Sequence, residues 1–476
     1  MSAVQLEEEV REILDCSEAD SLQDALNAVR LRLKYITGIK KYDPEKHFFA
    51  NDAEKCFENC HIPILIIAKP GIGKTYGMKQ LIEQFSNTYS GELGGEKVGF
   101  KQIVFAQTDV GDFSGVPMEV NGQVIRVQTD DLPNEERDGK YGVLFLDELT
   151  TADEQQVQPA LSLADSRRTC GPYKLPDGWL VVAAGNGPDC ENFVRLDLAT
   201  VTRFEVFNIP NVDYERDWKD YAESCNMPAY ILSFLDTYPE LIYKVEEYEE
   251  GFSDMTPYAP SAVPRSWEAF ASTVATACEE VGLEPTLERT NPKHLTPKFI
   301  KKIAMRFLGK DTAGLMEKFC VTVDACPISL EKILEGKEEP MAVWKERLDA
   351  KGQWKKEHIY YLLEEGKSKL KMGMNNAKID VNTGVDQEFA KQLANYVNWF
   401  IAVDRDDTSE EKDTIMAMLS MLFFDKGLSK ADDVSDMQKL CQFARSAEMM
   451  NRYDGIKEFI SRNREVLTAS AGFATY

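Results

Sequence analysis

The stretch that decides the fold runs from Ile62 to Thr75 and reads IPILIIAKPGIGKT. Its first half is a short β-branched apolar run, which predicts a buried strand. Its second half is a Gly/Pro turn that leads into helical spacing from Tyr76 to Phe85. Backbone N–H groups of such a turn point at an anion, and the dipole of the following helix favours negative charge there. The stretch therefore predicts a phosphate-binding loop.

The residue types of this loop suit a nucleotide with a divalent cation. We expect Lys74 to reach the β- and γ-phosphates and the Thr75 hydroxyl to ligate Mg²⁺. The motif normally opens with Gly, and this chain has Ala68 there, which adopts positive φ less cheaply. The alternative is a Gly-rich turn with an incidental lysine. The other residues expected to bind the nucleotide are Pro70, Gly71, Ile72, Gly73 and Tyr76.

A second stretch, Tyr141 to Glu148, reads YGVLFLDE and argues against that alternative. Its apolar run predicts a strand buried on both faces of a parallel sheet. Asp147 at the end of the strand suits the Mg²⁺ shell, and Glu148 suits the base that polarises an attacking water. A strand followed by a solvated acidic turn is the plainer interpretation. The phosphate loop earlier in the chain favours the catalytic one.

Further strands alternate with helical segments, which predicts a covered parallel sheet. Ligands of such sheets bind beyond the carboxyl ends of the strands, where the phosphate loop, Asp147 and Asn186 are all expected. The further strands are expected at Ile103–Ala106, Trp179–Ala184 and Arg203–Phe207.

Domain organisation follows from changes in pattern along the chain. The dipeptide Asn121-Gly122 between alternating segments predicts a β-hairpin. Residues Phe389, Leu393, Val397 and Phe400 form a helical stripe that indicates core packing. We expect an N-terminal helical segment (1–45), an α/β nucleotide-binding core (46–210) with a hairpin insert near 115–128, a helical lid (211–289) and a mainly helical C-terminal region (290–476).

Charge and composition restrict the partners. The formal net charge is −25, which disfavours general nucleic-acid binding but leaves room for a local basic patch. The apolar run Ile415–Phe424 is too short to span a bilayer, and the segment Met1–Asp20 has no signal-peptide core. We therefore expect a cytoplasmic protein without a membrane partner.

Three residues near the first strand raise the alternative of a metal site. Cys56, Cys60 and His61 lie close together in the sequence. No second pair of ligands follows them, so helical neighbours in a reducing compartment are the favoured interpretation.

Together these motifs resemble the AAA+ ATPases, and within them the MoxR-like branch of the helix-2-insert group. The resemblance covers roughly residues 40–285. It implies a P-loop NTPase core with a five-stranded parallel sheet of order 5-1-4-3-2, a helical lid, and a homo-oligomeric ring, usually a hexamer. It also implies Mg²⁺-dependent ATP hydrolysis and a role as a remodelling motor or metal-insertion chaperone for a protein substrate or adaptor, often a von Willebrand factor A-type protein. The motifs that carry it are the loop 68–75, the hairpin at Asn121-Gly122, Leu146-Asp147-Glu148, Ala183-Ala184-Gly185-Asn186, Thr202-Arg203-Phe204 and the segment 261–267, which reads SAVPRSW.

The resemblance also implies roles for single residues. Asn186 looks like sensor 1, whose carboxamide orients the attacking water, although a turn or cap asparagine is the plainer interpretation. Arg203 looks like the arginine finger that enters a neighbouring subunit, with Arg167 and Arg168 as rivals and a surface arginine as the alternative. Arg265 looks like sensor 2, after Pro264 at a helix start. It would act on its own subunit's nucleotide or on a neighbour's.

Two other functions compete with a protein-remodelling motor. The first is a nucleic-acid-directed AAA+ motor, such as a helicase loader or a restriction-type NTPase, which the acidic balance disfavours. The second is a nucleotide-dependent switch that barely hydrolyses, which Glu148 disfavours because a switch can dispense with a catalytic carboxylate. The sequence leaves the choice between ATP and GTP open.

Overall fold

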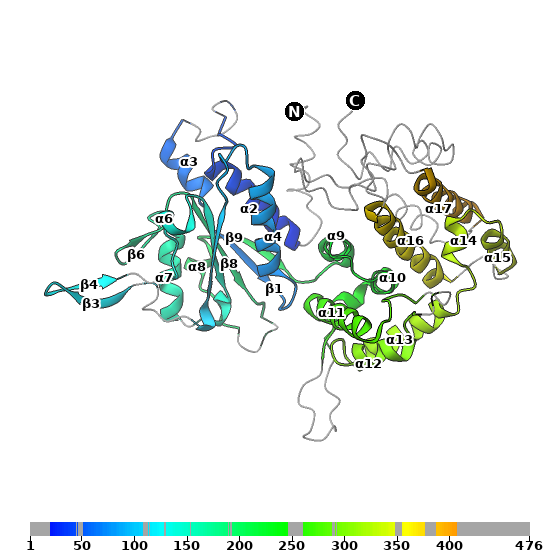
Figure 1. The fold of residues 1–476 in the computed structure, drawn as a ribbon. Coiled ribbons are helices and arrows are strands. Elements are labelled where there is room, and N and C mark those ends of the chain that lie inside the picture. Colours follow the sequence, from blue (N-terminus) through cyan, green and yellow to red (C-terminus); the bar gives the residue numbers. More distant parts are fainter. Residues whose placement is uncertain are drawn as a thin grey trace, which may run out of the picture. The chain divides into compact units, whose positions relative to one another are not determined.

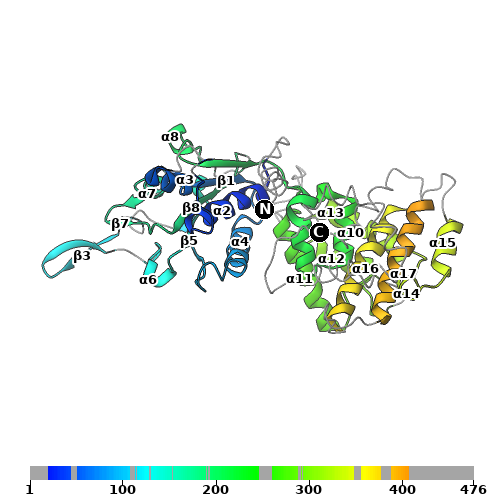
Figure 2. The same cartoon turned by 90° about the horizontal axis from the view of Figure 1, so that it is seen from above.

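A computed structural model places the chain in two compact units, Met1–Val212 and Asp213–Tyr476 (Figures 1 and 2). The structure describes residues 20–43, 45, 51–107, 113, 115–127, 130–152, 154–188, 190, 193–245, 260–287, 291, 293–347, 355–376 and 387–406. The apolar run Ile415–Phe424 lies outside these residues. Among the described helices, none has the length and apolar character that crossing a membrane requires.

The first unit is built on a five-stranded sheet in which every pairing is parallel. The strand order is β2-β5-β8-β1-β9. Counted along the chain within this sheet, the order is 2-3-4-1-5, which is the predicted order read from the opposite edge. The strands are β1 (Ile64–Ala68), β2 (Gly99–Val104), β5 (Gly142–Asp147), β8 (Trp179–Gly185) and β9 (Glu205–Ile209).

Helices cover both faces of the sheet, as its apolar strands require. Figure 1 shows α2 (Leu22–Ile36) and α4 (Lys74–Thr88) together on one face and α7 (Glu154–Ala164) on the other. Val157 and Leu161 of α7 belong to one core cluster with side chains of β1, β5 and β8. The other described helices of this unit are α3 (Ala53–Cys60), α6 (Glu135–Asp138) and α8 (Leu198–Val201), with 3₁₀ turns at Phe105–Gln107 and Leu149–Thr151.

The predicted hairpin is present as β3 (Val116–Val120) and β4 (Gln123–Val127), which pair antiparallel. Asn121 and Gly122 at its tip have φ of 54° and 78°. A two-residue turn of this hand matches the twist of the strands it joins, which is why Asn-Gly favours it. The hairpin extends away from the main sheet in both views (Figures 1 and 2). A second, shorter hairpin joins β6 (Thr169–Cys170) and β7 (Tyr173–Lys174).

The second unit is helical in the described residues. Pro264 occupies the first turn of α11, as expected, because a proline there loses no intrahelical hydrogen bond. Its helices are α9 (Lys219–Ser224), α10 (Ala229–Thr237), α11 (Pro264–Val281), α12 (Pro297–Ala304), α13 (Lys310–Asp324), α14 (Leu330–Leu334), α15 (Glu339–Arg347), α16 (Lys356–Asn376) and α17 (Gln387–Asp406), with a π-helical turn at Tyr214–Trp218 and a 3₁₀ turn at Pro239–Ile242.

The core of this unit joins segments that are far apart in the sequence. Helix α10 packs along α16, and α12 packs along α13. The stripe of Phe389, Leu393, Val397 and Phe400 on α17 is buried, which confirms that it is core packing. Residues on both sides of position 290 therefore share one packed unit.

A buried cluster of charges links α9, α10 and α16. The Lys219 ammonium lies 2.5 Å from the Asp236 carboxylate, and the Lys367 ammonium lies 2.9 Å from Glu223 and 2.6 Å from Glu364. The cluster holds three carboxyl groups and two ammonium groups. Burial of Glu364 raises its pKa to about 7, because Lys367 offsets only part of the cost of desolvating the carboxylate.

Candidate functional site

The phosphate loop has the backbone that an anion cradle needs. The chain leaves β1 at Ala68, turns through Lys69 to Gly73, and enters α4 at Lys74. Gly71 and Gly73 have φ of 79° and 96°, values that glycine adopts without steric cost. Ala68 ends the strand and is not among the residues with positive φ, so alanine costs nothing at this position. The departure from the usual motif therefore leaves the loop geometry intact.

Lys74 connects the loop to the predicted sensor. Its side chain is buried, and its ammonium donates hydrogen bonds to the carbonyl oxygens of Ala68 (2.9 Å) and Lys69 (3.2 Å). It also donates to the Asn186 carboxamide oxygen at 3.1 Å. The cation is thus held at the mouth of the loop, beside the polar end of β8.

The two predicted magnesium ligands are in direct contact. The Thr75 hydroxyl donates a hydrogen bond of 2.8 Å to the Asp147 carboxylate. The Gln102 amide of β2 donates to the same carboxylate oxygen at 2.9 Å. A hydroxyl and a carboxylate are hard oxygen donors of the kind that Mg²⁺ binds, directly or through its retained waters. The donor set therefore fits a Mg²⁺ ion bound together with a nucleotide phosphate.

Glu148 has an unusual backbone. Its φ and ψ are 59° and 32°, in the left-handed region, where a residue with a Cβ is uncommon. Its N–H donates to the Asp147 carboxylate at 3.0 Å, and its carbonyl accepts from the Thr151 hydroxyl at 2.8 Å. These bonds hold the strained turn that separates the two carboxylates. Strain of this kind is frequent at functional sites.

Asn186 is anchored through its backbone by Thr150. The Thr150 hydroxyl accepts a hydrogen bond from the Asn186 N–H (2.8 Å) and donates one to the Asn186 carbonyl (3.0 Å). Thr150 is only 1% exposed. A Cβ on the neighbouring Gly185 would lie 2.5 Å from the Thr150 methyl carbon, so glycine permits this close approach. The turn after β5 thus holds the tip of β8 in place.

The candidate arginines differ in availability. Arg203 is exposed and lies two residues before β9. Arg167 is exposed as well, whereas Arg168 is 3% exposed and donates to the carbonyl oxygens of Pro176 and Trp179. Burial lowers the pKa of Arg168 to about 10. Arg168 therefore serves its own fold, which leaves Arg167 as the exposed rival to Arg203.

Two further residues that we expect at the nucleotide lie in the first turns of helices. Tyr76 lies in the first turn of α4 and is half exposed. Arg265 lies in the first turn of α11, in the second unit, and is exposed. Its role at a nucleotide stays a prediction.

The cysteines and histidine near the first strand are engaged with other groups. The two ring nitrogens of His61 lie 2.7 Å from the Phe57 carbonyl oxygen and 2.6 Å from the Asp177 carbonyl oxygen. The Cys60 thiol lies 3.7 Å from the Tyr42 hydroxyl. Within the described ranges, no group of three potential metal-ligating side chains comes together.

Sequence reasoning missed Gln102 and Thr150. Gln102 is a polar residue in β2, and the strand that pairs with β2 ends at the predicted carboxylate Asp147. A polar side chain in such a strand was the available signal. Thr150 lies two residues after Glu148, within a run of residues that looks like an ordinary turn. Both act on the site through residues that are distant in the sequence.

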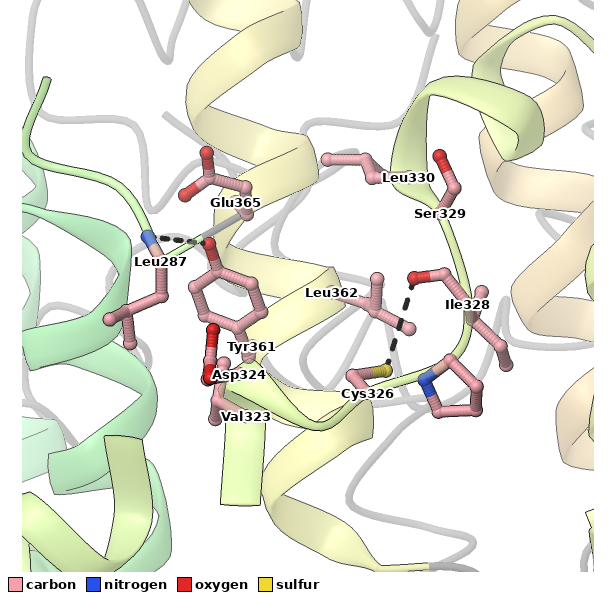
Figure 3. A pocket seen from close by; sticks show the side chains of 11 residues that line it. Leu287, Val323, Asp324, Cys326, Ile328, Ser329, Leu330, Tyr361, Leu362 and Glu365 are labelled. Atoms are coloured by element: carbon pink, nitrogen blue, oxygen red, sulfur yellow. Dashed lines mark hydrogen bonds between the residues drawn. The ribbon is translucent and has the colours of Figure 1, made fainter. Parts of the chain in front are cut away.

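The second unit contains a small, partly open cavity of about 90 Å³ (Figure 3). Leu287, Cys326, Ile328, Tyr361 and Glu365 are among its lining residues. The Tyr361 hydroxyl accepts a hydrogen bond from the Leu287 N–H at 3.2 Å. Burial raises the pKa of the Cys326 thiol to about 11, so the thiol is neutral. Pockets for drug-sized ligands and cofactors measure roughly 300–1,000 Å³, so this cavity is too small for a nucleotide.

No family model and no curated protein matches the chain. Among solved structures it is similar to a "putative ATPase" from Cytophaga hutchinsonii (14% identity, 64% of this chain and 89% of that chain, TM-score 0.24). It is also similar to an MCM homologue from Methanopyrus kandleri (14% identity, 67% and 61%, TM-score 0.25) and to PCH-2 from C. elegans (16% identity, 65% and 73%, TM-score 0.27). Similarities at these TM-scores carry no argument about function, which must come from the site itself.

Proposed function

We propose that this chain is a Mg²⁺-dependent ATPase of the AAA+ type. The observation that carries the proposal is the meeting of three strand ends at one place. Lys74 follows β1 and contacts Asn186 after β8, while Thr75 contacts Asp147 at the end of β5. A phosphate cation, two magnesium ligands, a base and a carboxamide are the parts that phosphoryl transfer to water needs.

Each side chain has a separate task in this proposal. The loop N–H groups and Lys74 bind the phosphates, and Thr75 with Asp147 would hold Mg²⁺. A Mg²⁺ ion held there would supply positive charge that offsets the negative charge of the phosphate oxygens. Glu148 accepts the proton of the attacking water, and Asn186 orients that water through its carboxamide. Gln102 keeps the Asp147 carboxylate turned toward Thr75.

The finer assignment rests on the motifs quoted above. We place the chain in the MoxR-like branch, working as a homo-oligomeric ring, usually a hexamer, with Arg203 reaching the neighbouring subunit's nucleotide. We assign residues 211–289 to a lid and residues 290–476 to a partner-facing region. The net charge of −25 supports a protein substrate or adaptor, such as a von Willebrand factor A-type protein, over a nucleic acid.

Hydrolysis by purified protein tests the proposal, with ATP and GTP compared in the presence and absence of Mg²⁺. Lys74→Ala removes the phosphate cation and should weaken nucleotide binding. Glu148→Gln keeps the shape of the carboxylate but cannot accept a proton, so it should bind ATP and lose turnover.

Glu83→Gln is the matched control, because it makes the same change on the exposed surface of α4. It should hydrolyse ATP at the wild-type rate. Unchanged hydrolysis in Glu148→Gln would show that the assigned base is wrong. Absence of hydrolysis in the wild type, with nucleotide tightly retained, would instead favour a nucleotide switch.

A further inference from the structure

The second unit carries a concentration of positive charge that the acidic chain as a whole does not predict. Residues 293–310 include Lys293, Lys298, Lys301, Lys302, Arg306 and Lys310 and contain no Asp or Glu, although the formal net charge of the chain is −25. This segment contains α12 and the start of α13. The segment is therefore a local basic region, which the net charge of the whole chain does not show.

Part of this charge forms a stripe on the exposed side of α12. Lys298 and Lys302 are four residues apart and are exposed, while Ile300 and Ile303 of the same helix are buried. Residues four apart on a helix lie on the same face. Helical conformation continues through Met305 (φ −57°, ψ −24°), and the exposed Arg306 follows one turn after Lys302. We call Lys298, Lys302 and Arg306 the α12 basic surface.

Among the described residues, no carboxylate is paired with the three cations of this surface. Lys301, on the adjoining side of the helix, pairs with Glu317 of α13 at 2.6 Å. Lys298, Lys302 and Arg306 have no ion-pair partner among the residues that the structure describes. Exposed positive charge of this kind steers the approach of an anionic partner and complements its charge.

We propose that the α12 basic surface binds an acidic helical protein segment whose carboxylates lie beside apolar side chains. Lys298 and Arg306 are eight residues apart, which is about 12 Å along a helix and matches two turns of a helical partner. Met305 lies between the cations in sequence and is 45% exposed, so an apolar contact is available next to them. The surface thus offers both chemistries that such a segment carries.

A nucleic acid fits this surface less well. Single strands bind to stacking platforms of exposed aromatic side chains as well as to positive charge. In the described residues the only large aromatic side chain that is well exposed is Tyr76, in the first unit. A nucleic acid also extends beyond a patch of this length and would meet a chain of net charge −25.

Binding by the full chain tests the proposal without reference to ATP hydrolysis. The probe is a fluorescein-labelled twelve-residue peptide of Glu and Leu. Glu occupies every fourth position and the position beside it, and Leu occupies the others. Binding is measured by fluorescence anisotropy at two salt concentrations. We expect saturable binding that weakens with salt. The triple variant Lys298→Gln, Lys302→Gln, Arg306→Gln should bind about five- to tenfold more weakly, the effect of losing three exposed ion pairs.

A second triple variant controls for net charge. Lys332→Gln, Lys337→Gln and Lys345→Gln remove the same charge from α14, α15 and the turn between them, where Lys332 and Lys337 have carboxylate partners. This variant should bind the peptide like the wild type. Met305→Ser should weaken binding of the Glu/Leu peptide but not of a peptide in which Ser replaces Leu.

Three results would overturn the proposal. The first is no peptide binding by the wild type, and the second is equal weakening in both triple variants. The third is tighter binding of a labelled twelve-nucleotide oligo-dT that the α12 variant abolishes, which would assign the surface to a nucleic acid. Circular dichroism of each variant excludes unfolding as the cause of any loss. Because ATP hydrolysis is not measured, these results are independent of the proposed ATPase.

Discussion

Replacing Thr150 by valine tests whether the turn after β5 positions Asn186. Valine keeps the branched shape of threonine but lacks the hydroxyl, which accepts from the Asn186 N–H at 2.8 Å and donates to its carbonyl at 3.0 Å. Thr150→Ser is the matched control, because serine keeps the hydroxyl and loses only the methyl group. A Cβ on Gly185 would lie 2.5 Å from this methyl carbon, so the methyl group faces a glycine. Removing the methyl group therefore creates no clash.

The expected effect follows from the two hydrogen bonds. A buried polar group left without its partner costs about 1–3 kcal/mol, and Asn186 is half-buried, so we expect the lower part of that range. If about 1.4 kcal/mol of this cost falls on the transition state, the rate falls about tenfold. Thr150→Val should therefore lower kcat about tenfold and leave KM within about threefold, because Lys74 and the loop still bind the phosphates.

Steady-state ATP hydrolysis and binding of a fluorescent ATP analogue measure these quantities. Thermal unfolding in parallel shows how much of each variant is folded. A merely structural role for Thr150 would lower the apparent kcat only in proportion to the unfolded fraction, so kcat is compared after correction for that fraction. Full kcat in Thr150→Val, or an equal loss in Thr150→Ser, would refute the reasoning.

Three further predictions concern the proposed arginine finger, the buried charges and the sheet. Arg203→Ala should bind ATP normally but hydrolyse it poorly. Mixing it with Lys74→Ala subunits should restore part of the turnover, because some mixed interfaces then combine an intact loop with an intact arginine. Co-assembled rings without any recovery would move the assignment to Arg167. The pKa of Glu364 is raised to about 7 from an ordinary value of 4.5. Between these two pH values the folded state retains a proton that the unfolded state has lost. The free energy of unfolding should therefore fall as pH rises from about 4.5 to about 7, and level off above. Glu364→Gln should remove that fall in urea unfolding measured across this range, and an unchanged pH profile would contradict the assignment. Gly142→Ala should destabilise the first unit by about 1–3 kcal/mol in thermal unfolding, because its Cβ would lie 2.6 Å from the Trp179 ring, whereas Gly91→Ala, with open space around its Cβ, should leave stability nearly unchanged.

Local sequence was enough to predict the parts of the site whose geometry is set by neighbouring residues. The loop from Gly71 to Thr75 needs glycines at positive φ and a helix start, and both requirements are visible in consecutive residues. The apolar run that ends at Asp147 likewise identifies a buried strand with a polar end. The parallel sheet followed from the alternation of such strands with helices, and its strand order from the resemblance to a known family.

The tertiary structure alone decided which side chains support the site. Gln102 reaches Asp147 because β2 pairs with β5 in one register, and a shift of one residue would turn the amide to the other face. Thr150 reaches Asn186 because two strand ends lie side by side, and Arg168 is withdrawn from the surface by carbonyls of a later turn. These partners are not neighbours in the sequence, so no local pattern predicts their contacts. Register and packing, which depend on the whole sheet at once, bring them within hydrogen-bonding distance.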